Sequence, residues 1–292
     1  MKIETKKFDS TKREIYIEAD TEVVKKKFED VFSRINKKAK IPGFRPGRIP
    51  IDVLEKYYGK EAHQQVMQEL ILQVYNEAIE KEKLEVVDYP DIYDIKLDRN
   101  NLSFKAKVEI MPQINFKNYR RIKINYKKIE VSDEEVEQYL NSLAQSRKID
   151  ALDDNFARSF GFPDITEMKK SIKAQLFIQK ENENRRRIER DILDYLLKET
   201  DFKVPSSLVE RKLQELLHQA KIELALKGLS KEEVEKKEEG LSQELKREAE
   251  RLVRLNVIFS HIAKEENIPQ QENIFQYVLE FLFREGDWQV VD

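Results

Sequence analysis

The sequence predicts a small α+β N-terminal domain followed by a mainly α-helical region with long helical arms. Three observations support this fold class. Alternating apolar residues, which indicate strands, are confined to the first 131 residues, whereas apolar residues three and four positions apart, which indicate helices, dominate the rest. Charged residues make up 38 % of the 292-residue chain, and only seven glycines and eight prolines occur. This composition is typical of long, solvent-exposed helices.

Composition also limits the function. Lys and Arg number 54 against 56 Asp and Glu, giving a net charge of -2, so any attraction for nucleic acid must be local. Cysteine is absent, which excludes disulfides, thiolate catalysis and sulfur-ligated metals. The N-terminus lacks the apolar core of a signal peptide, and no apolar run approaches membrane-spanning length. The sequence therefore predicts a soluble cytoplasmic protein that does not contact membranes.

The N-terminal domain is expected over residues 1–112. Asp20 and Thr21 offer a helix N-cap, and Gly59 is expected to end a short helix that begins after Pro50. Asp98–Asn101 has the composition of a turn. The expected elements, in chain order, are a strand at 13–19, a helix at 22–40, helices at 51–58 and 60–82, and strands at 84–97 and 102–110.

Residues 113–150 are expected to form a linker strand and a helix. Ile122, Ile124 and Tyr126 alternate as in a strand, and Ser132 with Glu135 forms a capping box that opens a helix to about Lys148. No sheet is expected after this linker.

Four helices are expected in a C-terminal domain over residues 151–292. Asp164 caps the first, whose middle, 179–187, is polar on every side, which predicts an arm that crosses solvent for about 45 Å. The others are a helix from Pro205 to Gly228, a helix from Ser230 to Ile268 that is broken or loosened around Gly240, and an aromatic segment over 274–283.

The loop from Lys40 to Pro50 holds two of the seven glycines and three of the eight prolines. Pro fixes φ and Gly permits positive φ, so the loop has a defined path that directs Phe44, Arg45 and Arg48 outward. The last turns of the preceding helix add Arg34, Lys37 and Lys38. Two interpretations remain open: a contact surface, or a turn whose phenylalanine packs into its own domain.

The segment Gly43-Phe44-Arg45-Pro46-Gly47-Arg48-Ile49-Pro50, placed between two helices of a small α+β domain, resembles the loop signature Gly-Phe-Arg-x-Gly-Lys/Arg-x-Pro of trigger factor, the family of bacterial ribosome-associated chaperones. The resemblance covers residues 1–112 and resumes at 155–161 and in the C-terminal helices. It implies that the N-terminal domain binds a ribosomal protein and rRNA at the tunnel exit. The ribosome-binding residues are then Gly43, Phe44, Arg45, Pro46, Gly47, Arg48, Arg34, Lys37 and Lys38.

Two departures from the family pattern stand out. Members usually carry an FKBP-type prolyl isomerase domain of roughly one hundred residues where this chain has only residues 141–154, so no isomerase is expected. The family also usually continues for several helices beyond the position of Ile268, so one arm is expected to be shortened. His63, His218 and His261 fall on separate predicted helices without metal-ligand spacing, so neither metal nor cofactor is expected.

The resemblance implies an ATP-independent holdase for nascent or unfolded polypeptides. Its client-binding side chains are expected on the arms, at Leu208, Leu216, Leu224, Ile258, Phe275 and Phe281. A ribosome-independent chaperone or assembly factor, and an RNA-binding protein that uses the basic N-terminal patch, remain alternatives. Client preference and a homodimer off the ribosome also stay open.

Overall fold

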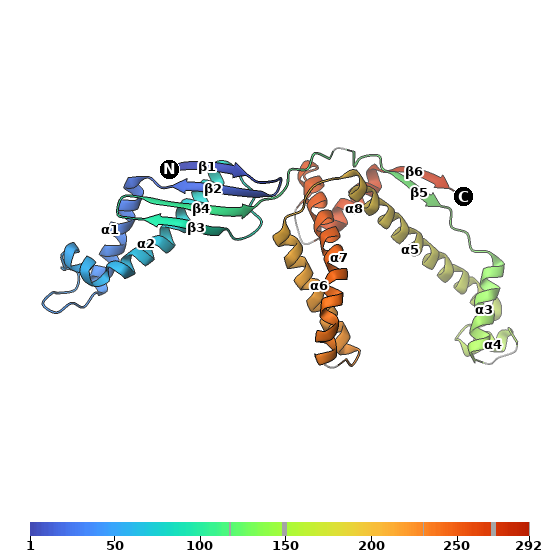
Figure 1. The fold of residues 1–292 in the computed structure, drawn as a ribbon. Helices are drawn as coiled ribbons and strands as arrows, with labels where there is room; N and C mark the ends of the chain where they lie inside the picture. The colour runs from blue at the N-terminus through green and yellow to red at the C-terminus, as the bar shows by residue number, and fades with distance from the viewer. Residues whose placement is uncertain (117, 148–150, 230, 270–272, 292) are drawn as a thin grey trace. The chain divides into compact units, whose positions relative to one another are not determined.

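The computed structural model describes residues 1–291 except 117, 148–150, 230 and 270–272, and it leaves aside the side chains of 231, 232 and 235–239. The predicted ends of two helices, at Lys148 and Ser230, lie outside the described residues. The elements (Figure 1) are β1 (Lys2–Lys7), β2 (Lys12–Glu18), α1 (Thr21–Lys38), α2 (Ile51–Glu82), β3 (Asp91–Leu97), β4 (Leu102–Glu109), β5 (Lys123–Lys127), α3 (Asp133–Arg147), α4 (Asp154–Ser159), α5 (Ile165–Glu199), α6 (Ser206–Leu226), α7 (Lys231–Glu265), α8 (Ile274–Glu285) and β6 (Asp287–Val291).

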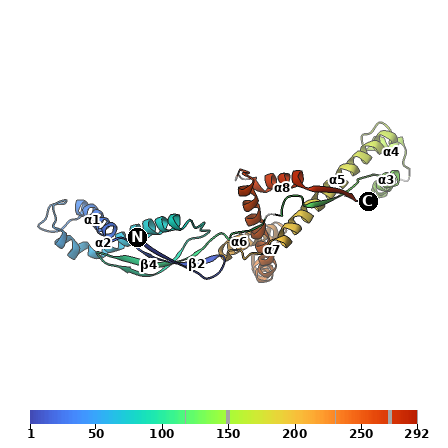
Figure 2. The same cartoon turned by 90° about the horizontal axis from the view of Figure 1, so that it is seen from above.

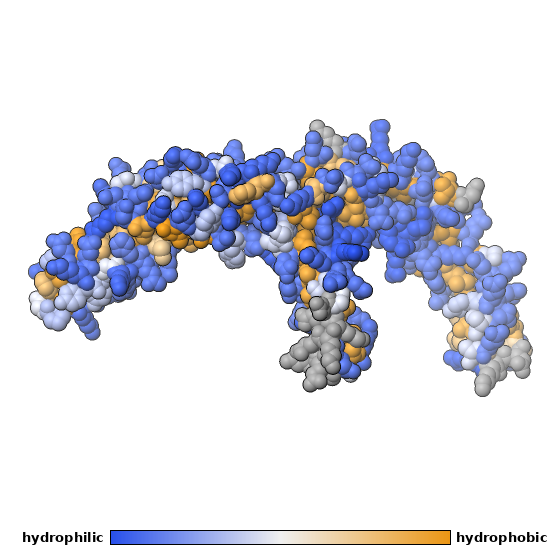
Figure 3. Space-filling model, viewed as in Figure 1, coloured by the Kyte–Doolittle hydropathy of each residue, from blue (hydrophilic) through white to orange (hydrophobic). Residues whose placement is uncertain are grey.

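Contacts divide the chain into two compact units, residues 1–114 with 202–257 and residues 115–201 with 258–292. The predicted boundary at 112 lies close to the first division. Residues 202–257 of the predicted domain 151–292 group with the N-terminal residues, and Val204 and Val253 there cluster with Met111. The face drawn in Figure 3 is mostly hydrophilic, with hydrophobic patches in both units.

An antiparallel sheet of order β1-β2-β4-β3 forms the base of the first unit. Ile15 and Ile17 of β2 pair with Ala106 and Phe104 of β4, and all four side chains are buried on one face. The predicted alternation of β2 and β4 is confirmed because these strands have one face in the core. Strand β1 was not predicted, because its residues are mostly charged and exposed and show no apolar alternation.

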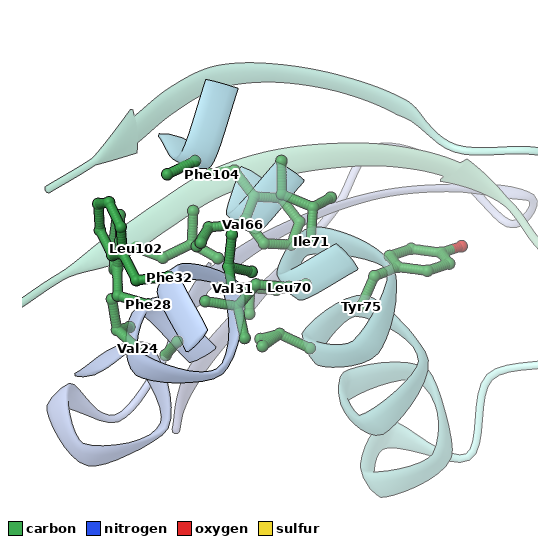
Figure 4. Packing of buried hydrophobic residues seen from close by; sticks show 14 of the residues in the cluster. Val24, Phe28, Val31, Phe32, Val66, Leu70, Ile71, Tyr75, Leu102 and Phe104 are labelled. Carbon is green, nitrogen blue, oxygen red and sulfur yellow. The ribbon is translucent and has the colours of Figure 1, made fainter. Parts of the chain in front are cut away.

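Helices α1 and α2 cover the buried face of this sheet. Phe28 and Val31 of α1 and Leu70 of α2 pack with residues of β4 in one cluster (Figure 4). The predicted N-cap of α1 is wrong in its chemistry: the Asp20 carboxylate makes no capping hydrogen bond and instead pairs with the N-terminal ammonium.

The predicted break at Gly59 is wrong, since α2 runs unbroken from Ile51 to Glu82. Glycine costs about 1 kcal/mol in a helix interior, and buried residues on both sides, including Leu54 and Ala62, hold the helix together. The predicted strand 84–97 is shortened to β3, because Pro90 cannot donate to a ladder. The turn at 98–101 is confirmed: the Asp98 carboxylate accepts the N–H groups of Asn100 and Asn101 at 2.7 and 2.8 Å.

The hairpin of α6 and α7 joins the first unit through polar and apolar contacts. The Glu109 carboxylate at the end of β4 accepts the Ser207 N–H at 2.8 Å and also binds the Ser206 hydroxyl. Val204 and Val253 pack together with Met111 and Ile114. The third C-terminal helix, predicted to be broken or loosened around Gly240, is not broken there, because α7 is continuous through this residue.

The second unit confirms two predicted caps. Ser132 and Glu135 exchange the two hydrogen bonds of a capping box at 3.0 and 3.3 Å, and the Asp164 carboxylate accepts the N–H groups of Thr166 and Glu167, each at 2.9 Å. The short helix α4 was not predicted; its Phe156 is buried against α3 and α5.

Most residues of the middle of α5 are exposed, as predicted for 179–187, but this stretch also contacts the β5 segment. Side chains of this stretch donate to backbone carbonyls of the β5 segment: Asn184 to Lys127 at 3.1 Å and Arg187 to Asn125 at 2.7 Å. The polar face therefore pairs with exposed backbone. Periodicity cannot distinguish this arrangement from a solvated helix.

The expectation of no sheet beyond the linker is also wrong. β6 pairs in parallel with β5, placing Trp288 opposite Ile124. The two paired strands lie more than 150 residues apart in the sequence, so no local pattern predicts their pairing. The preceding helix, α8, buries Val278 and Leu282, and its Phe275 stacks on Phe259 with ring centroids 4.5 Å apart. Among the described residues, no helix has the length and apolar character needed to cross a membrane.

Candidate binding loop between α1 and α2

Two consecutive turns of the pattern X-Pro-Gly-X build the loop. In Ile41–Phe44 the last N–H donates to the first carbonyl at 3.1 Å, and Arg45–Arg48 repeats this bond at 3.1 Å. Gly43 and Gly47 have φ of 85° and 83°. Proline at the second position and a positive φ at the third define a type II turn. Each glycine is therefore required by its backbone conformation.

Both ends of the loop are anchored in the core of the first unit. Ile41 and Ile49 are buried on either side of the exposed tip. Asn36, in the last turn of α1, donates its side-chain amide to the Ile49 carbonyl at 2.9 Å and accepts the Ile49 N–H at 3.1 Å. The Asn36 backbone carbonyl accepts the Gly47 N–H at 2.9 Å. Asn36 thus holds the second turn against the helix. Sequence reasoning missed it, since its partner is thirteen residues away.

Every residue from Gly43 to Arg48 is exposed, and Phe44 keeps 40 % of its surface accessible. Phe44 is therefore not buried in its own domain, which favours the contact interpretation. In the part of the chain that the structure describes, Arg45 and Arg48 make no ion pair, so both guanidiniums are available to an external anion.

The last turns of α1, predicted to be basic, lie next to this loop. Their three cations are not equally available to a partner. Lys37 and Lys38 are exposed and, within the described residues, unpaired. Arg34 instead faces α2, where one guanidinium nitrogen lies 2.7 and 2.9 Å from the two carboxylate oxygens of Glu69. Part of the Arg34 charge is therefore compensated within the protein.

A pocket of about 270 Å³ lies between α1 and α2 beside the loop. Arg34 and Lys38 line it together with Tyr58, Glu61 and Gln65. The lining therefore carries charges of both signs, with the Glu61 carboxylate beside the two cations. Tyr58 and Gln65 carry no sequence signal that separates them from ordinary helix residues.

The six predicted client-binding residues fall into different environments. Ile258 is fully buried and Phe281 is 9 % exposed, so both are core residues and cannot contact a client in this conformation. Leu208, Leu216 and Leu224 are partly buried, and Phe275 is 46 % exposed. Other large apolar side chains are more accessible than most of these: Phe177, Ile178, Ile222, Leu226, Trp288 and Val290.

No metal site is found among the described residues, which contain no group of three or more His, Asp or Glu side chains placed to hold an ion. His63, one of the three histidines, packs edge-on against Phe28 with ring centroids 4.9 Å apart.

Comparison with known proteins places both halves of the chain. Residues 1–143 match the family model described as bacterial trigger factor protein, and residues 164–289 match the model of the bacterial trigger factor C-terminus. The trigger factor of Halothermothrix orenii is 23 % identical over 390 residues, with 98 % of this chain and 91 % of that protein covered. The trigger factor of Natranaerobius thermophilus is 30 % identical over 141 residues, with 48 % of this chain and 32 % of that protein covered.

A solved structure described as "Promiscuous Substrate Recognition in Folding and Assembly Activities of the Trigger Factor Chaperone" superposes with a TM-score of 0.58 at 14 % identity, covering 97 % of this chain and 90 % of that one. At this identity the likeness shows the fold alone. Only residues 144–163 lie between the two matched ranges, fewer than a folded domain contains. The two family models together cover nearly the whole chain, and the chain belongs to the trigger factor family.

Proposed function

We propose that this protein is an ATP-independent chaperone of the cytoplasm that binds nascent or unfolded polypeptides beside the ribosomal exit tunnel. The observation that carries the proposal is the loop from Ile41 to Ile49. Its two glycine turns and the Asn36 contacts hold an aromatic side chain and two guanidiniums outward before any partner binds. Such preorganisation lowers the entropic cost of docking.

Each exposed group of the loop suits a different part of a ribosomal surface. Phe44 would enter an apolar pocket of a ribosomal protein, and Arg45 would pair with a carboxylate or a phosphate there. Arg48, Lys37 and Lys38 would contact rRNA phosphates and release counterions, so this part of the affinity would fall as salt rises.

Holding of clients would rest on scattered apolar side chains. Leu208, Leu216, Leu224 and Phe275 keep accessible surface, and Phe177 and Ile222 add to it. Apolar contact demands no particular client sequence, because burial of apolar area is non-directional. We further propose that the protein binds clients without isomerising their prolyl bonds, since residues 144–163 leave no room for an isomerase domain between the two matched ranges.

Cosedimentation with purified ribosomes tests the docking role. The double variant Phe44→Ala/Arg45→Ala should lose most of its ribosome binding. The matched control Tyr89→Ala/Lys7→Ala also removes an exposed aromatic and an exposed cation from the first unit, but away from the loop, and should pellet like the parent protein. Equal pelleting of both variants would show that the loop is not the docking site.

Suppression of aggregation of a chemically denatured model protein, measured by light scattering without ATP, tests the holding role separately. The parent protein and the Phe44→Ala/Arg45→Ala variant should suppress aggregation equally, because the loop is not part of the client surface. Absence of suppression by the parent protein would contradict chaperone action. A rise in the rate of proline-limited refolding would contradict the proposed lack of isomerase activity.

A further inference from the structure

Strand β6 has one side that no described strand covers. The sheet contains β5 and β6 alone among the described residues, and the two lie side by side (Figure 2). The Asp287 N–H donates to the Ile122 carbonyl at 2.8 Å, which fixes the side of β6 that faces β5. In a parallel ladder every second residue faces the same neighbour. Trp288 and Val290 therefore direct their backbone N–H and carbonyl groups away from β5.

The other side of the sheet is closed. Asn125 and Lys127 of β5 use their carbonyls to accept hydrogen bonds from Arg187 and Asn184 of α5, at 2.7 and 3.1 Å. An added strand would find these two carbonyls of β5 already hydrogen-bonded. The outer side of β6 is consequently the edge at which backbone groups remain available.

This edge lacks the protection that the other edge strands carry. β1 bears three lysines among six residues, and β3 has a register shift between Tyr93 and Lys96. Lysine and irregular pairing both discourage edge-to-edge association. β6 reads Asp-Trp-Gln-Val-Val, with its only charge at the start. Trp288 is 47 % and Val290 is 71 % exposed. An edge without lysine, whose outward-facing residues Trp288 and Val290 are both apolar, is a template for strand pairing.

A pocket of about 390 Å³ adjoins the strand, and Trp288 belongs to both. The Trp288 indole N–H donates to the Phe283 carbonyl at 2.9 Å, and the two rings stack 6.0 Å apart, which fixes the indole. Ile178 and Ile188 add apolar walls. The charged residues of the lining, Glu181 and Arg185, are of opposite sign. The site therefore favours an uncharged apolar side chain.

We infer that β6 binds an extended apolar segment of an unfolded polypeptide as an added strand, with one side chain of that segment entering the pocket beside Trp288. Backbone hydrogen bonds to Trp288 and Val290 supply affinity for any sequence, and the pocket selects apolar side chains, as in other strand-addition sites. The inference rests on the proposed holding function and gives it a defined site.

Two substitutions at Val290 distinguish the contribution of its backbone N–H to peptide binding from that of its side chain. Val290→Pro removes the outward N–H and keeps an apolar ring of similar size; an edge strand tolerates this change because that N–H takes no part in pairing with β5. Val290→Ala keeps the N–H and removes apolar surface. The probe is a short capped peptide rich in leucine and serine, without charged side chains, whose binding to the full-length protein is followed by fluorescence anisotropy.

Val290→Pro should weaken peptide binding about fivefold, the value of one net hydrogen bond, and Val290→Ala about threefold or less. Leu226→Ala, which removes an apolar side chain that is 83 % exposed on α6, should bind the peptide like the parent protein. Amide hydrogen exchange adds a direct readout: saturating peptide should slow exchange at Trp288 and Val290, but leave Gln289, which already faces β5, unchanged.

Unchanged exchange at Trp288 and Val290 with peptide bound, or equal peptide affinity of Val290→Pro and the parent protein, would overturn the inference. Exchange that slows without peptide as protein concentration rises would assign the edge to a second copy of the chain and overturn it as well. If the parent protein binds no peptide and fails to suppress aggregation, the holding function fails with it. If it suppresses aggregation but shows no edge protection, strand addition alone is wrong.

Discussion

Replacement of Asn36 by alanine should loosen the binding loop while leaving every exposed loop side chain in place. Asn36→Ala removes two hydrogen bonds to the backbone of Ile49, of 2.9 and 3.1 Å. Each such bond contributes about 1 kcal/mol net, so the closed loop should lose about 2 kcal/mol relative to open conformations. Docking would then have to reorder the loop, and affinity for ribosomes should fall by up to about thirtyfold.

The assay is cosedimentation with ribosomes over a range of protein concentrations, with urea unfolding as a check on the fold. Asn76→Ala is the matched control, because Asn76 is an exposed asparagine on α2 whose side chain makes no hydrogen bond to any described residue. Wild-type affinity for the Asn36→Ala variant would refute the claim that loop preorganisation contributes to docking. Equal loss of affinity in Asn76→Ala would trace the effect to general destabilisation instead.

Three further predictions use glycines and carboxylates of the first unit. Gly47→Ala places a side chain at φ 83° and should weaken ribosome binding by about 1 kcal/mol through backbone strain alone, since a Cβ there meets no atom within 4 Å; unaltered binding would contradict the turn assignment. Gly59→Ala, in the interior of α2 where a Cβ makes only an ordinary 3.7 Å contact with Glu55, should instead raise the free energy of unfolding by up to about 1 kcal/mol, and a lowered value in urea unfolding would disagree. The hydrogen bond from Lys203 lowers the pKa of Asp9, and bonds from Ser206 and Ser207 lower the pKa of Glu109 despite the opposing effect of burial. A carboxyl whose pKa is lowered by folding adds stability above its unfolded pKa and loses it as pH falls through the folded value; the melting temperature should therefore drop on acidification, and less steeply in Asp9→Asn, which a pH series of thermal melts checks.

Local patterns predicted the elements whose stabilising contacts are local. The strand at β4, the helix at α1 and the caps at Ser132 and Asp164 follow from residue spacing, because burial on one face and capping bonds act within a few residues. The turn conformation of the loop was also predictable, since Pro-Gly pairs determine their own turns, whereas the exposure of Phe44 was left open.

The rest depends on distant partners. β6 forms because β5 lies beside it, and the polar middle of α5 is satisfied by carbonyls of Asn125 and Lys127. The helix α2 continues through Gly59 because the turns on either side of it are buried. This tertiary effect outweighs the low helix propensity of glycine. In the sequence Asn36 cannot be distinguished from other polar helix residues, because its role depends on the contact with Ile49.

The prediction of client contacts at Ile258 and Phe281 was also limited by what local patterns can show. Both lie on apolar faces that a sequence pattern cannot assign to core or client, and the structure buries them. Trp288 and Val290, which the structure exposes, lie on a strand that was not predicted.

The most direct test of the central claim is photo-crosslinking from the loop tip. A benzophenone-bearing phenylalanine analogue in place of Phe44 keeps the aromatic ring and reports its neighbours in purified ribosome complexes, and the same analogue in place of Tyr89, which is 95 % exposed in the same unit, serves as the reference position. The proposed docking predicts a crosslink from position 44 to a ribosomal component at the tunnel exit and none from position 89. Cosedimentation without any crosslink from position 44, or with equal crosslinks from both positions, would contradict it.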